Sequence, residues 1–310
     1  MSRFLVTGGA GFIGSHIVEA LVKKKHYVRV LDNFSSGRKE NLQGLSGKID
    51  LITGDIRSLS TCVNAARGID FVLHQAAARS VPKSMKNPRE YNEINIGGTL
   101  NMLEASCGRG VRCFVFASSS SVYGDVDRFP QREDFLPQPI SPYALTKLTG
   151  EHYCRMFSFH YGLPTVSLRY FNVFGPRQSL DDEYAVVIPK FINCIMNDEK
   201  PPIYGTGKQS RDFTYIDNVV AANIASARAL KKGARVFNVG CGRNNDILGL
   251  VRILNKIMRK NITPVFLDAR PGDVLKTQAD IRRIARELGY RPKVDFSKGL
   301  ELTVKYFKNA

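Results

Sequence analysis

Tyr143 and Lys147, in the segment 141–147, form the most informative pair of reactive side chains in the chain. Ser141 is a favourable helix N-cap and Pro142 suits the first helical position, so the segment predicts the start of a helix. Residues four apart share one helix face, so the phenol and the ammonium are expected in one site. The helix dipole and the ammonium should both lower the pKa of the phenol from about 10 towards neutrality. The pair therefore indicates proton transfer.

The spacing Tyr-x-x-x-Lys is common by chance, so its context decides. A run of four serines, 118–121, lies just upstream and offers a hydroxyl donor. Gly8, Gly11 and Gly14 stand between an expected strand and an expected helix. Glycines at such a turn let the backbone approach a pyrophosphate, and the helix N-terminus supplies N–H donors. The chain is therefore predicted to bind a dinucleotide in the same domain as the proton-transfer pair.

Asp32 follows the second expected strand, Tyr27–Leu31. A carboxylate at this position accepts hydrogen bonds from the adenosine ribose and repels a 2′-phosphate. NAD is therefore expected rather than NADP, although Arg38, close by in the sequence, keeps NADP open.

Short apolar runs alternate with helical stretches over the first 172 residues. This alternation predicts an α/β fold with a Rossmann-like doubly wound parallel sheet. The expected strands are Phe4–Thr7, Tyr27–Leu31, Ile49–Ile52, Phe71–Leu73, Cys113–Ala117, Thr165–Arg169 and Val236–Val239. The expected helices are His16–Lys25, Leu59–Ala66, Gly98–Cys107 and Pro142–Tyr161.

After Asn172 the alternation fades, and proline and glycine become frequent. This change predicts a smaller C-terminal α/β substrate domain that covers the ends of the strands. The expected division is an NAD-binding domain at residues 1–174 plus about 212–242, and a substrate-binding domain at about 175–211 and 243–310.

The composition, with 43% apolar and 24% charged residues in a chain of 310, is typical of a soluble globular protein. The chain has neither a run of about 18 uncharged apolar residues nor a signal peptide, so no membrane contact and a cytoplasmic location are expected. Six scattered cysteines without a Cys-x-x-Cys pair indicate reduced thiols and no metal site. The net charge of +17 invites nucleic-acid binding, but the basic residues lie in short dispersed clusters. No nucleic-acid partner is expected, and steering of an anionic substrate is the milder interpretation.

Motifs along almost the whole chain resemble those of the extended short-chain dehydrogenases/reductases. They are most similar to those of nucleotide-sugar 4-epimerases of the UDP-glucose and UDP-N-acetylglucosamine type. The matching segments are 7–14, 32–37, 54–57, 74–77, 80–82, 118–124, 141–147, 169–175, 210–213 and 270–273. The resemblance implies bound NAD, a UDP-sugar substrate and a homodimer formed through the helices near Gly98–Cys107 and Pro142–Tyr161.

Carried over by position, the resemblance also implies roles for individual residues. The catalytic residues would be Ser119, Tyr143 and Lys147. The cofactor-binding residues would be Gly8, Gly11, Phe12, Ile13, Asp32, Asn33, Ser36, Gly37, Asp55, Ile56, Gln75, Ala76, Ala77, Asn95, Ser118, Tyr143, Lys147 and Phe171. The substrate-binding residues would be Ser80, Val81, Ser84, Ser119, Ser120, Tyr143, Asn172, Arg211, Arg270, Asp273 and Thr277. Arginine suits a diphosphate because its planar fork makes paired, charge-assisted hydrogen bonds.

The implied reaction is a 4-epimerisation. Tyr143, as a phenolate, would remove the proton from sugar O4 while hydride passes from C4 to NAD⁺. Ser119 would hydrogen-bond the same oxygen, and Lys147 would hold the nicotinamide ribose and keep the phenolate charged. The 4-keto sugar would then rotate and take the hydride back on its opposite face, which regenerates NAD⁺.

Related reactions are distinguished by the two residues after the catalytic hydroxyl. Dehydratases that resemble this chain carry an Asp-Glu pair there, and decarboxylases usually carry an acidic residue. Here the positions are Ser120 and Ser121, whose hydroxyls cannot do that acid–base work. Both reactions are therefore disfavoured, whereas UDP-glucuronate 4-epimerisation stays open. A non-catalytic NAD-binding scaffold is a further alternative, against which the complete set of Ser119, Tyr143 and Lys147 argues.

The size of the sugar pocket is suggested by Thr277, seven positions after Arg270. In the family this residue lines the pocket and is bulky in enzymes restricted to UDP-glucose and UDP-galactose. A small threonine, together with the segment 80–84, resembles the forms that accept N-acetylated sugars. The N-acetylated pair is therefore expected as substrate besides the plain hexoses.

Overall fold

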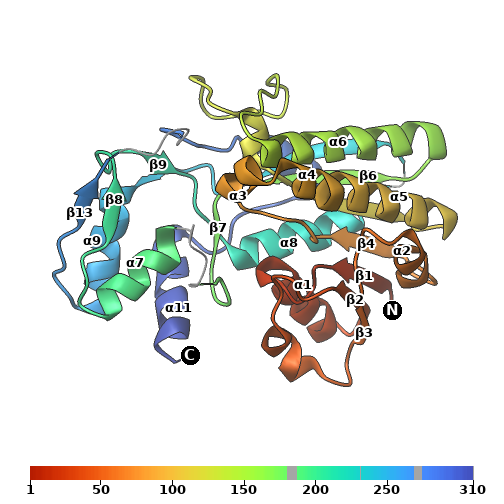
Figure 1. Ribbon diagram of the computed structural model, residues 1–310, viewed down its shortest axis with the longest axis horizontal. Helices are drawn as coiled ribbons and strands as arrows, with labels where there is room; N and C mark the ends of the chain where they lie inside the picture. Colours follow the sequence, from red (N-terminus) through yellow and green to blue (C-terminus); the bar gives the residue numbers. More distant parts are fainter. Residues whose placement is uncertain (180–186, 231, 269–273, 310) are drawn as a thin grey trace.

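The computed structural model describes residues 1–179, 187–230, 232–268 and 274–309. Within these ranges, a seven-stranded parallel sheet dominates the larger part of the molecule, in the order β11-β6-β5-β4-β1-β2-β3 (Figure 1). Its strands are β1 (Arg3–Thr7), β2 (Tyr27–Asp32), β3 (Asp50–Thr53), β4 (Phe71–His74), β5 (Cys113–Ser119), β6 (Thr165–Tyr170) and β11 (Ala234–Val239). The doubly wound parallel sheet predicted from the sequence is confirmed.

Helices cover both faces of this sheet. One face packs against α1 (Phe12–Lys23) and α8 (Ile216–Ala227), and the short helix η1 (Lys39–Leu45) lies beside α1. The other face packs against the layer that contains α2 (Leu59–Ala65), α5 (Gly98–Gly108) and α6 (Pro142–Tyr161). Shorter segments complete this second layer: α3 (Val81–Lys86), α4 (Pro88–Tyr91), the π-helix η2 (Asn92–Gly97) and η3 (Ser120–Tyr123).

Alternation along the strands divides the core into two layers. Successive strand side chains point to opposite faces, so neighbouring residues of one strand belong to different layers. Phe4 and Val6 pack on the side of α1 and α8, whereas Leu5 packs on the side of α5 and α6. Because both faces are buried, every strand of the sheet centre reads as a continuous apolar run, which is why the sequence located these strands well.

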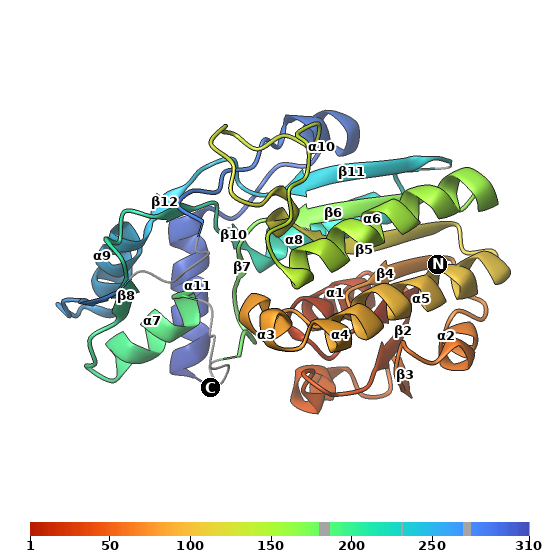
Figure 2. The same ribbon diagram turned by 45° about the horizontal axis from the view of Figure 1, so that its top comes forward.

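The smaller part of the molecule lies beside the carboxyl ends of the strands (Figure 1). It contains α7 (Val187–Met196), α9 (Ile247–Met258) and α11 (Phe296–Lys308) together with short strand pairs. The strands are β7 (Val173–Phe174), β8 (Pro202–Tyr204), β9 (Ser210–Arg211), β10 (Thr214–Tyr215), β12 (Asn245–Asp246) and β13 (Val265–Leu267). Helix α10 (Arg282–Leu288) instead packs against β11 at the edge of the main sheet (Figure 2). The domain boundaries expected from the sequence stay a prediction.

Helix α1 begins earlier than the sequence suggests. The expected helix was His16–Lys25, but α1 starts at Phe12 and ends at Lys23, and Lys25 has a φ of 59°. Gly14 disfavours a helix by propensity, yet here it lies inside α1, because a Cβ at this position would overlap the carbonyl oxygen of Gly8. The close approach of two backbone segments therefore overrides local propensity.

Candidate active site

The predicted site residues gather at the carboxyl ends of the parallel strands. Gly8 follows β1, Asn33 follows β2, Gln75 follows β4, Ser120 follows β5 and Asn172 follows β6. In doubly wound sheets, ligands bind in the crevice at this edge. The topology thus brings together residues that lie more than 100 positions apart in the sequence.

The turn between β1 and α1 has the geometry that a dinucleotide requires. Gly8 has a φ of 65°, and a Cβ on it would lie 2.8 Å from Cα of Ala76. Gly11 donates its N–H to the Gly8 carbonyl at 3.1 Å and precedes α1 as its N-cap. Phe12 and Ile13, in the first turn of α1, are partly exposed. Only glycine fits these close approaches, and the open helix N-terminus offers N–H groups to a phosphate, so the residues present fit NAD.

Asp32 holds the loop after β2 against this turn. Its carboxylate accepts hydrogen bonds from the N–H groups of Ala10 and Phe34, both at 2.8 Å. Gly37 lies next to the carboxylate, since a Cβ on it would be 2.9 Å from Oδ1 of Asp32. A carboxylate can accept further bonds, so Asp32 remains able to bind a ribose while it organises the loop.

Asn33, which follows β2, contacts Asp55, which lies after β3. Asn33 Nδ2 donates to Asp55 at 2.9 Å. Hydrogen bonds from the Arg57 side chain, the largest contribution, hold the pKa of the Asp55 carboxyl at about 2. Ser36, in the loop between, is exposed, whereas Ile56 is buried against Gly98 in the core. Of these expected cofactor residues, Ile56 therefore has the least surface available for a ligand.

Gln75 and Asn95, both expected to bind the cofactor, hold the backbone of the site. Gln75 donates to Asn223 at 3.0 Å and accepts from the Tyr170 hydroxyl at 3.1 Å. Asn95, in the π-helical turn η2, accepts from the Ala78 N–H at 2.8 Å and donates to the Ala78 carbonyl at 3.0 Å. These bonds fix the segment 75–79, which includes Ala76 and Ala77, in place at the end of β4.

Phe171 and Ser84 are fully buried. Phe171, expected among the cofactor contacts, is fully buried in a small core with Tyr123 and Ala279. Ser84, expected to bind substrate, is also fully buried, and its hydroxyl accepts the N–H of Tyr143 at 3.2 Å. Both side chains are packed within the protein, and the roles expected for them in binding the cofactor and the substrate stay predictions. Ser80 caps α3 by accepting the Lys83 N–H, and Val81, next to it, is exposed.

Helix α6 begins as predicted and brings the reactive groups together. Ser141 accepts the N–H of Ala144 at 3.2 Å as the N-cap. The side chain of Tyr143 hydrogen-bonds Ser119. Lys147 Nζ donates to the Ala117 carbonyl at 2.8 Å and lies 5.9 Å from the centre of the Tyr143 ring. The hydroxyl, the phenol and the ammonium expected from the sequence are therefore side by side.

The pKa of Tyr143 differs in direction from the sequence-based expectation. Burial raises the pKa of this phenol, and the hydrogen bond to Ser119 offsets only part of that effect. Burial also lowers the pKa of Lys147 from 10.5 to about 8. The expected lowering of the Tyr143 pKa by the helix and the ammonium is thus outweighed by desolvation in the protein alone. A further positive charge is needed to favour the phenolate.

The four serines after β5 have different partners. Ser119 accepts hydrogen bonds from the N–H and the hydroxyl of Ser121, at 3.2 and 2.9 Å. Ser118, expected near the cofactor, donates to Glu151 at 2.5 Å and is buried. Ser120 is partly exposed. Ser119 is therefore the member of the run that faces Tyr143, and Ser121 orients it.

Asn172 and Thr277, both expected to bind substrate, contact each other. Asn172 has a φ of 33° and donates to the Thr277 hydroxyl at 2.9 Å. Arg211 donates to the carbonyls of Ser210 and Leu275 at 3.0 and 3.3 Å. Arg270 and Asp273 lie outside the described residues.

Asp212 is a structural residue of the site to which the sequence analysis assigned no role. Its fully buried carboxylate accepts N–H groups from Cys241, Gly242 and Ala279 at 2.8 to 3.0 Å. Its carbonyl accepts from the Asn172 amide at 3.3 Å. Its place beside Arg211, in a segment that resembles the family, was the available signal.

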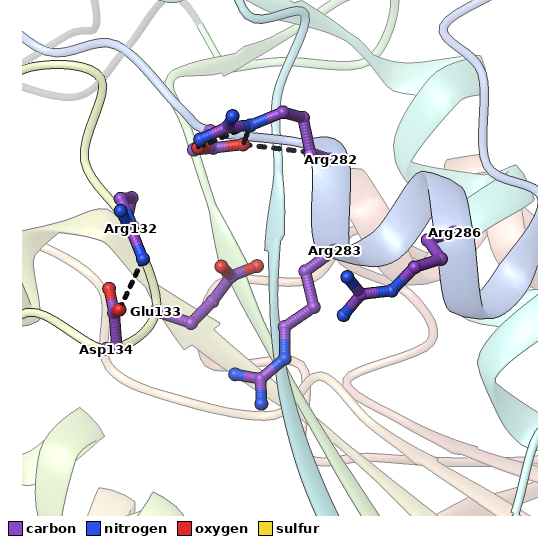
Figure 3. A pocket seen from close by; sticks show the side chains of 7 residues that line it. Arg132, Glu133, Asp134, Arg282, Arg283 and Arg286 are labelled. Atoms are coloured by element: carbon purple, nitrogen blue, oxygen red, sulfur yellow. Dashed lines mark hydrogen bonds and ion pairs between the residues drawn. The ribbon is translucent and has the colours of Figure 1, made fainter.

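A cavity of about 430 Å³ lies at another place, between residues 132–134 and the start of α10 (Figure 3). Arg132 pairs with Asp134 at 2.6 Å, and Arg282 pairs with Asp280 at 2.5 Å. Glu133 accepts the Asn238 N–H at 2.9 Å. Two of its arginines are therefore paired with aspartates of the same wall, and Tyr143 and Lys147 do not line it. The candidate active site is therefore at the carboxyl ends of the parallel strands and does not include this cavity.

In the part of the chain that the structure describes, no helix is both long and apolar enough to cross a membrane. The six cysteines, all within the described ranges, are free thiols.

Lys147→Met should stabilise the protein while removing the ammonium from the site. Burial lowers the pKa of Lys147 to about 8 in the folded protein, so holding the charge at pH 7 costs about 3 kcal/mol. Between pH 8 and about 10.5, Lys147 is protonated to a greater extent in the unfolded chain than in the folded one. The free energy of unfolding of the native protein therefore increases, relative to that of the variant, as pH rises through this range. Urea denaturation at several pH values measures the difference, with the exposed-site variant Lys305→Met as control. A difference in unfolding free energy that does not change with pH would contradict this account.

The chain is similar to known proteins over almost its whole length. The sequence pattern described as "NAD dependent epimerase/dehydratase family" matches residues 4–240. A putative UDP-glucose 4-epimerase of Methanocaldococcus jannaschii is 36% identical over 308 residues, which cover 98% of each chain. Among solved structures, the UDP-N-acetylglucosamine 4-epimerase from Methanobrevibacter ruminantium M1, in complex with UDP-N-acetylmuramic acid, is 41% identical with a TM-score of 0.95 and covers 99% of this chain and 98% of its own.

A second solved structure has a different sugar. The UDP-glucuronic acid 4-epimerase from Bacillus cereus, in complex with UDP-glucuronic acid and NAD, is 37% identical with a TM-score of 0.91, and 99% of each chain is covered. The family match spans the glycine turn, Ser119, Tyr143 and Lys147. The chain belongs to the NAD-dependent epimerase/dehydratase family, and NAD is its cofactor.

Proposed function

We propose that the protein interconverts UDP-hexoses at C4, with UDP-GlcNAc and UDP-GalNAc as substrates besides UDP-glucose and UDP-galactose. The observation that carries the proposal is the contact of Ser119 with Tyr143, with Lys147 one helical turn further along α6. Ser120 and Ser121 support epimerisation over dehydration, because two hydroxyls replace the acids that dehydration requires. The UDP-GlcNAc 4-epimerase named above, at 41% identity, supports the N-acetylated pair.

In this proposal NAD supplies the hydride acceptor, the hydride donor and a positive charge. Tyr143 Oη takes the proton of sugar O4 and returns it at the end of the cycle. Ser119 Oγ hydrogen-bonds the same oxygen, and Ser121 fixes the orientation of that hydroxyl. The Lys147 ammonium stabilises the phenolate form, which burial otherwise disfavours. Asn172, Arg211 and Thr277, from the strand ends and the smaller part, are proposed to bind the UDP-sugar.

UDP-glucuronate is the second candidate substrate, and one observation favours it. Burial is the largest influence on Tyr143 and raises its pKa, but the positive charge of Arg79 acts in the opposite direction. A guanidinium that acts on the reactive phenol would also attract a sugar carboxylate. The net charge of +17 favours any anionic substrate.

Tyr143→Phe should abolish epimerisation while leaving the fold intact. Removing a group that transfers a proton typically lowers the rate by at least about 100-fold. The purified protein is incubated with UDP-glucose, UDP-galactose, UDP-GlcNAc, UDP-GalNAc and UDP-glucuronate, and the products are separated by chromatography. Tyr161→Phe, on an exposed tyrosine of the same helix, is the matched control. A native protein that binds NAD without converting any of the five sugars would instead indicate an NAD-binding scaffold.

Thr277→Tyr should separate the two hexose pairs. The added ring fills space beside Asn172, so turnover of the N-acetylated pair should fall by about tenfold or more while the plain hexoses are still converted. Thr277→Ser retains the acceptor for the Asn172 amide and should behave as the native protein. Thr277→Val removes that acceptor without adding volume, so it should affect both pairs equally. Unchanged turnover of the N-acetylated pair by Thr277→Tyr would disprove the pocket assignment.

A homodimer through α5 and α6 is part of the proposal. Leu145, Met156 and Phe159 form an exposed apolar stripe on α6, with exposed fractions of 53%, 48% and 83%. Such a stripe on an outer helix is typical of an interface between subunits. Phe159→Glu should therefore convert a dimer into a monomer in analytical ultracentrifugation at micromolar concentration. Leu136→Glu, at an exposed loop position, is the control. A native protein that sediments as a monomer would rule out this interface.

A further inference from the structure

A buried ion pair lies directly beneath the reactive face of α6. Arg169, on β6, donates from Nε and Nη2 to the two carboxylate oxygens of Glu151, on α6, at 2.9 and 2.7 Å. Their side chains are 4% and 5% exposed. The Ser118 hydroxyl donates to the same carboxylate at 2.5 Å. The paired geometry satisfies the carboxylate, which is the condition under which a buried charge is tolerated.

The pair belongs to the same contact surface as the catalytic residues. Tyr143, Lys147 and Glu151 follow one another at intervals of four along α6 and therefore share one helix face. Three consecutive residues of β5 each bond a different member of this face. Ala117 accepts from Lys147, Ser118 donates to Glu151, and Ser119 hydrogen-bonds Tyr143. Glu151 thus binds Ser118, the middle one of the three strand residues. The residues on either side of it, Ala117 and Ser119, contact Lys147 and Tyr143.

Arg169 also determines which partner Glu151 has. A lysine and a glutamate four residues apart on a helix are close enough to attract each other. Here Lys147 donates to a backbone carbonyl, while Glu151 directs both oxygens to Arg169. The Arg169 guanidinium lies 4.7 Å from the centre of the Tyr123 ring, and the Tyr123 hydroxyl donates to Asn238 at 2.7 Å. These contacts fix the guanidinium beside the carboxylate.

We propose that Glu151 and Arg169 are positioning residues for the proposed reaction: Arg169 occupies the Glu151 carboxylate and so leaves the Lys147 ammonium available to the cofactor and the phenol. Glu151, through Ser118, at the same time holds Ser119 at Tyr143. The predicted effect on turnover rests on the proposed function, whereas the predicted effect on the pKa of Lys147 does not.

Three other described side chains that face Lys147, on β4, β5 and α6, carry no negative charge with which it could pair. His74, on β4, is fully buried, and desolvation lowers its pKa to about 3, so its imidazole is neutral over the working range. Phe116, on β5, presents its ring 5.1 Å from Lys147 Nζ. Tyr143, on α6, holds its proton because burial raises its pKa. Glu151, one helical turn further along the same face of α6, is therefore the carboxylate that would become free to pair with Lys147 once Arg169 is removed.

The experiment measures the titration of Lys147 in the full-length protein. NMR of lysine labelled with ¹³C at Cε follows the ammonium, and its signal is assigned by its loss in Lys147→Met. Native Lys147 should titrate near 8. In Arg169→Met the freed carboxylate should pair with Lys147 and raise its pKa by about one unit or more. In the double variant Arg169→Met/Glu151→Leu no carboxylate remains, and the pKa should return to the native value. A Lys147 pKa that does not move in Arg169→Met overturns the proposal.

Glu151→Gln in the Arg169→Met background is a conservative form of the double variant. The amide keeps the shape and a hydrogen-bond acceptor for Ser118 but carries no charge, so the pKa of Lys147 should return to the native value. A pKa that stays raised would show that the freed carboxylate is not the cause of the rise, and would overturn the proposal. Arg169→Met/Glu151→Leu replaces a buried ion pair by apolar side chains, a change that proteins commonly tolerate.

Turnover of the sugar that the native enzyme converts separates this inference from the proposed function. Arg169→Met should lower kcat by about tenfold or more. An Arg169→Met enzyme that keeps the native kcat overturns the proposal. If the pKa of Lys147 changes as expected but no UDP-sugar is converted, the positioning of Lys147 by Arg169 stands and the proposed function fails.

Discussion

The placement of α6 against the end of β5 is the constraint on which the site depends. Ala117, Ser118 and Ser119 are consecutive in the strand, and each bonds a side chain from the same face of the helix. A shift of one helical turn would move these side chains by about 5.4 Å and break all three contacts together. The phenol, the ammonium and the hydroxyl therefore have one common geometry, set by one helix and one strand.

Much of the fold could be predicted from the sequence, because the sheet is buried on both faces. Its strands appear as apolar runs, and α6 has the expected bounds Pro142–Tyr161, with the start that Ser141 and Pro142 indicated. The start of α1 was wrong, since local propensity counts Gly14 against a helix. That residue instead meets the backbone of Gly8, a contact that only the folded chain reveals.

The candidate site could be predicted as a set of residues but less well as a set of roles. Ser119, Tyr143 and Lys147 were brought together as expected. Phe171 and Ser84, from equally well-matched motifs, have fully buried side chains, and their expected roles stay predictions. A motif records that a residue is required and does not distinguish a group that touches the ligand from one that holds the backbone. The pKa of Tyr143 was missed for a related reason: desolvation depends on burial, which spacing along a helix does not report.

Asp212 has a mechanical consequence for the whole molecule. Three separate segments of the chain, at Asn172, Cys241 and Ala279, hydrogen-bond Asp212 on a fourth. Bonds that converge on a single buried group resist sliding of one part past the other and leave rotation about that point as the easiest relative motion. Thr277 and Asn172 lie next to this axis, so their separation would change least if the two parts opened. Segments of the smaller part far from Asp212 would then move farthest, while the segments that bond Asp212 would keep their spacing.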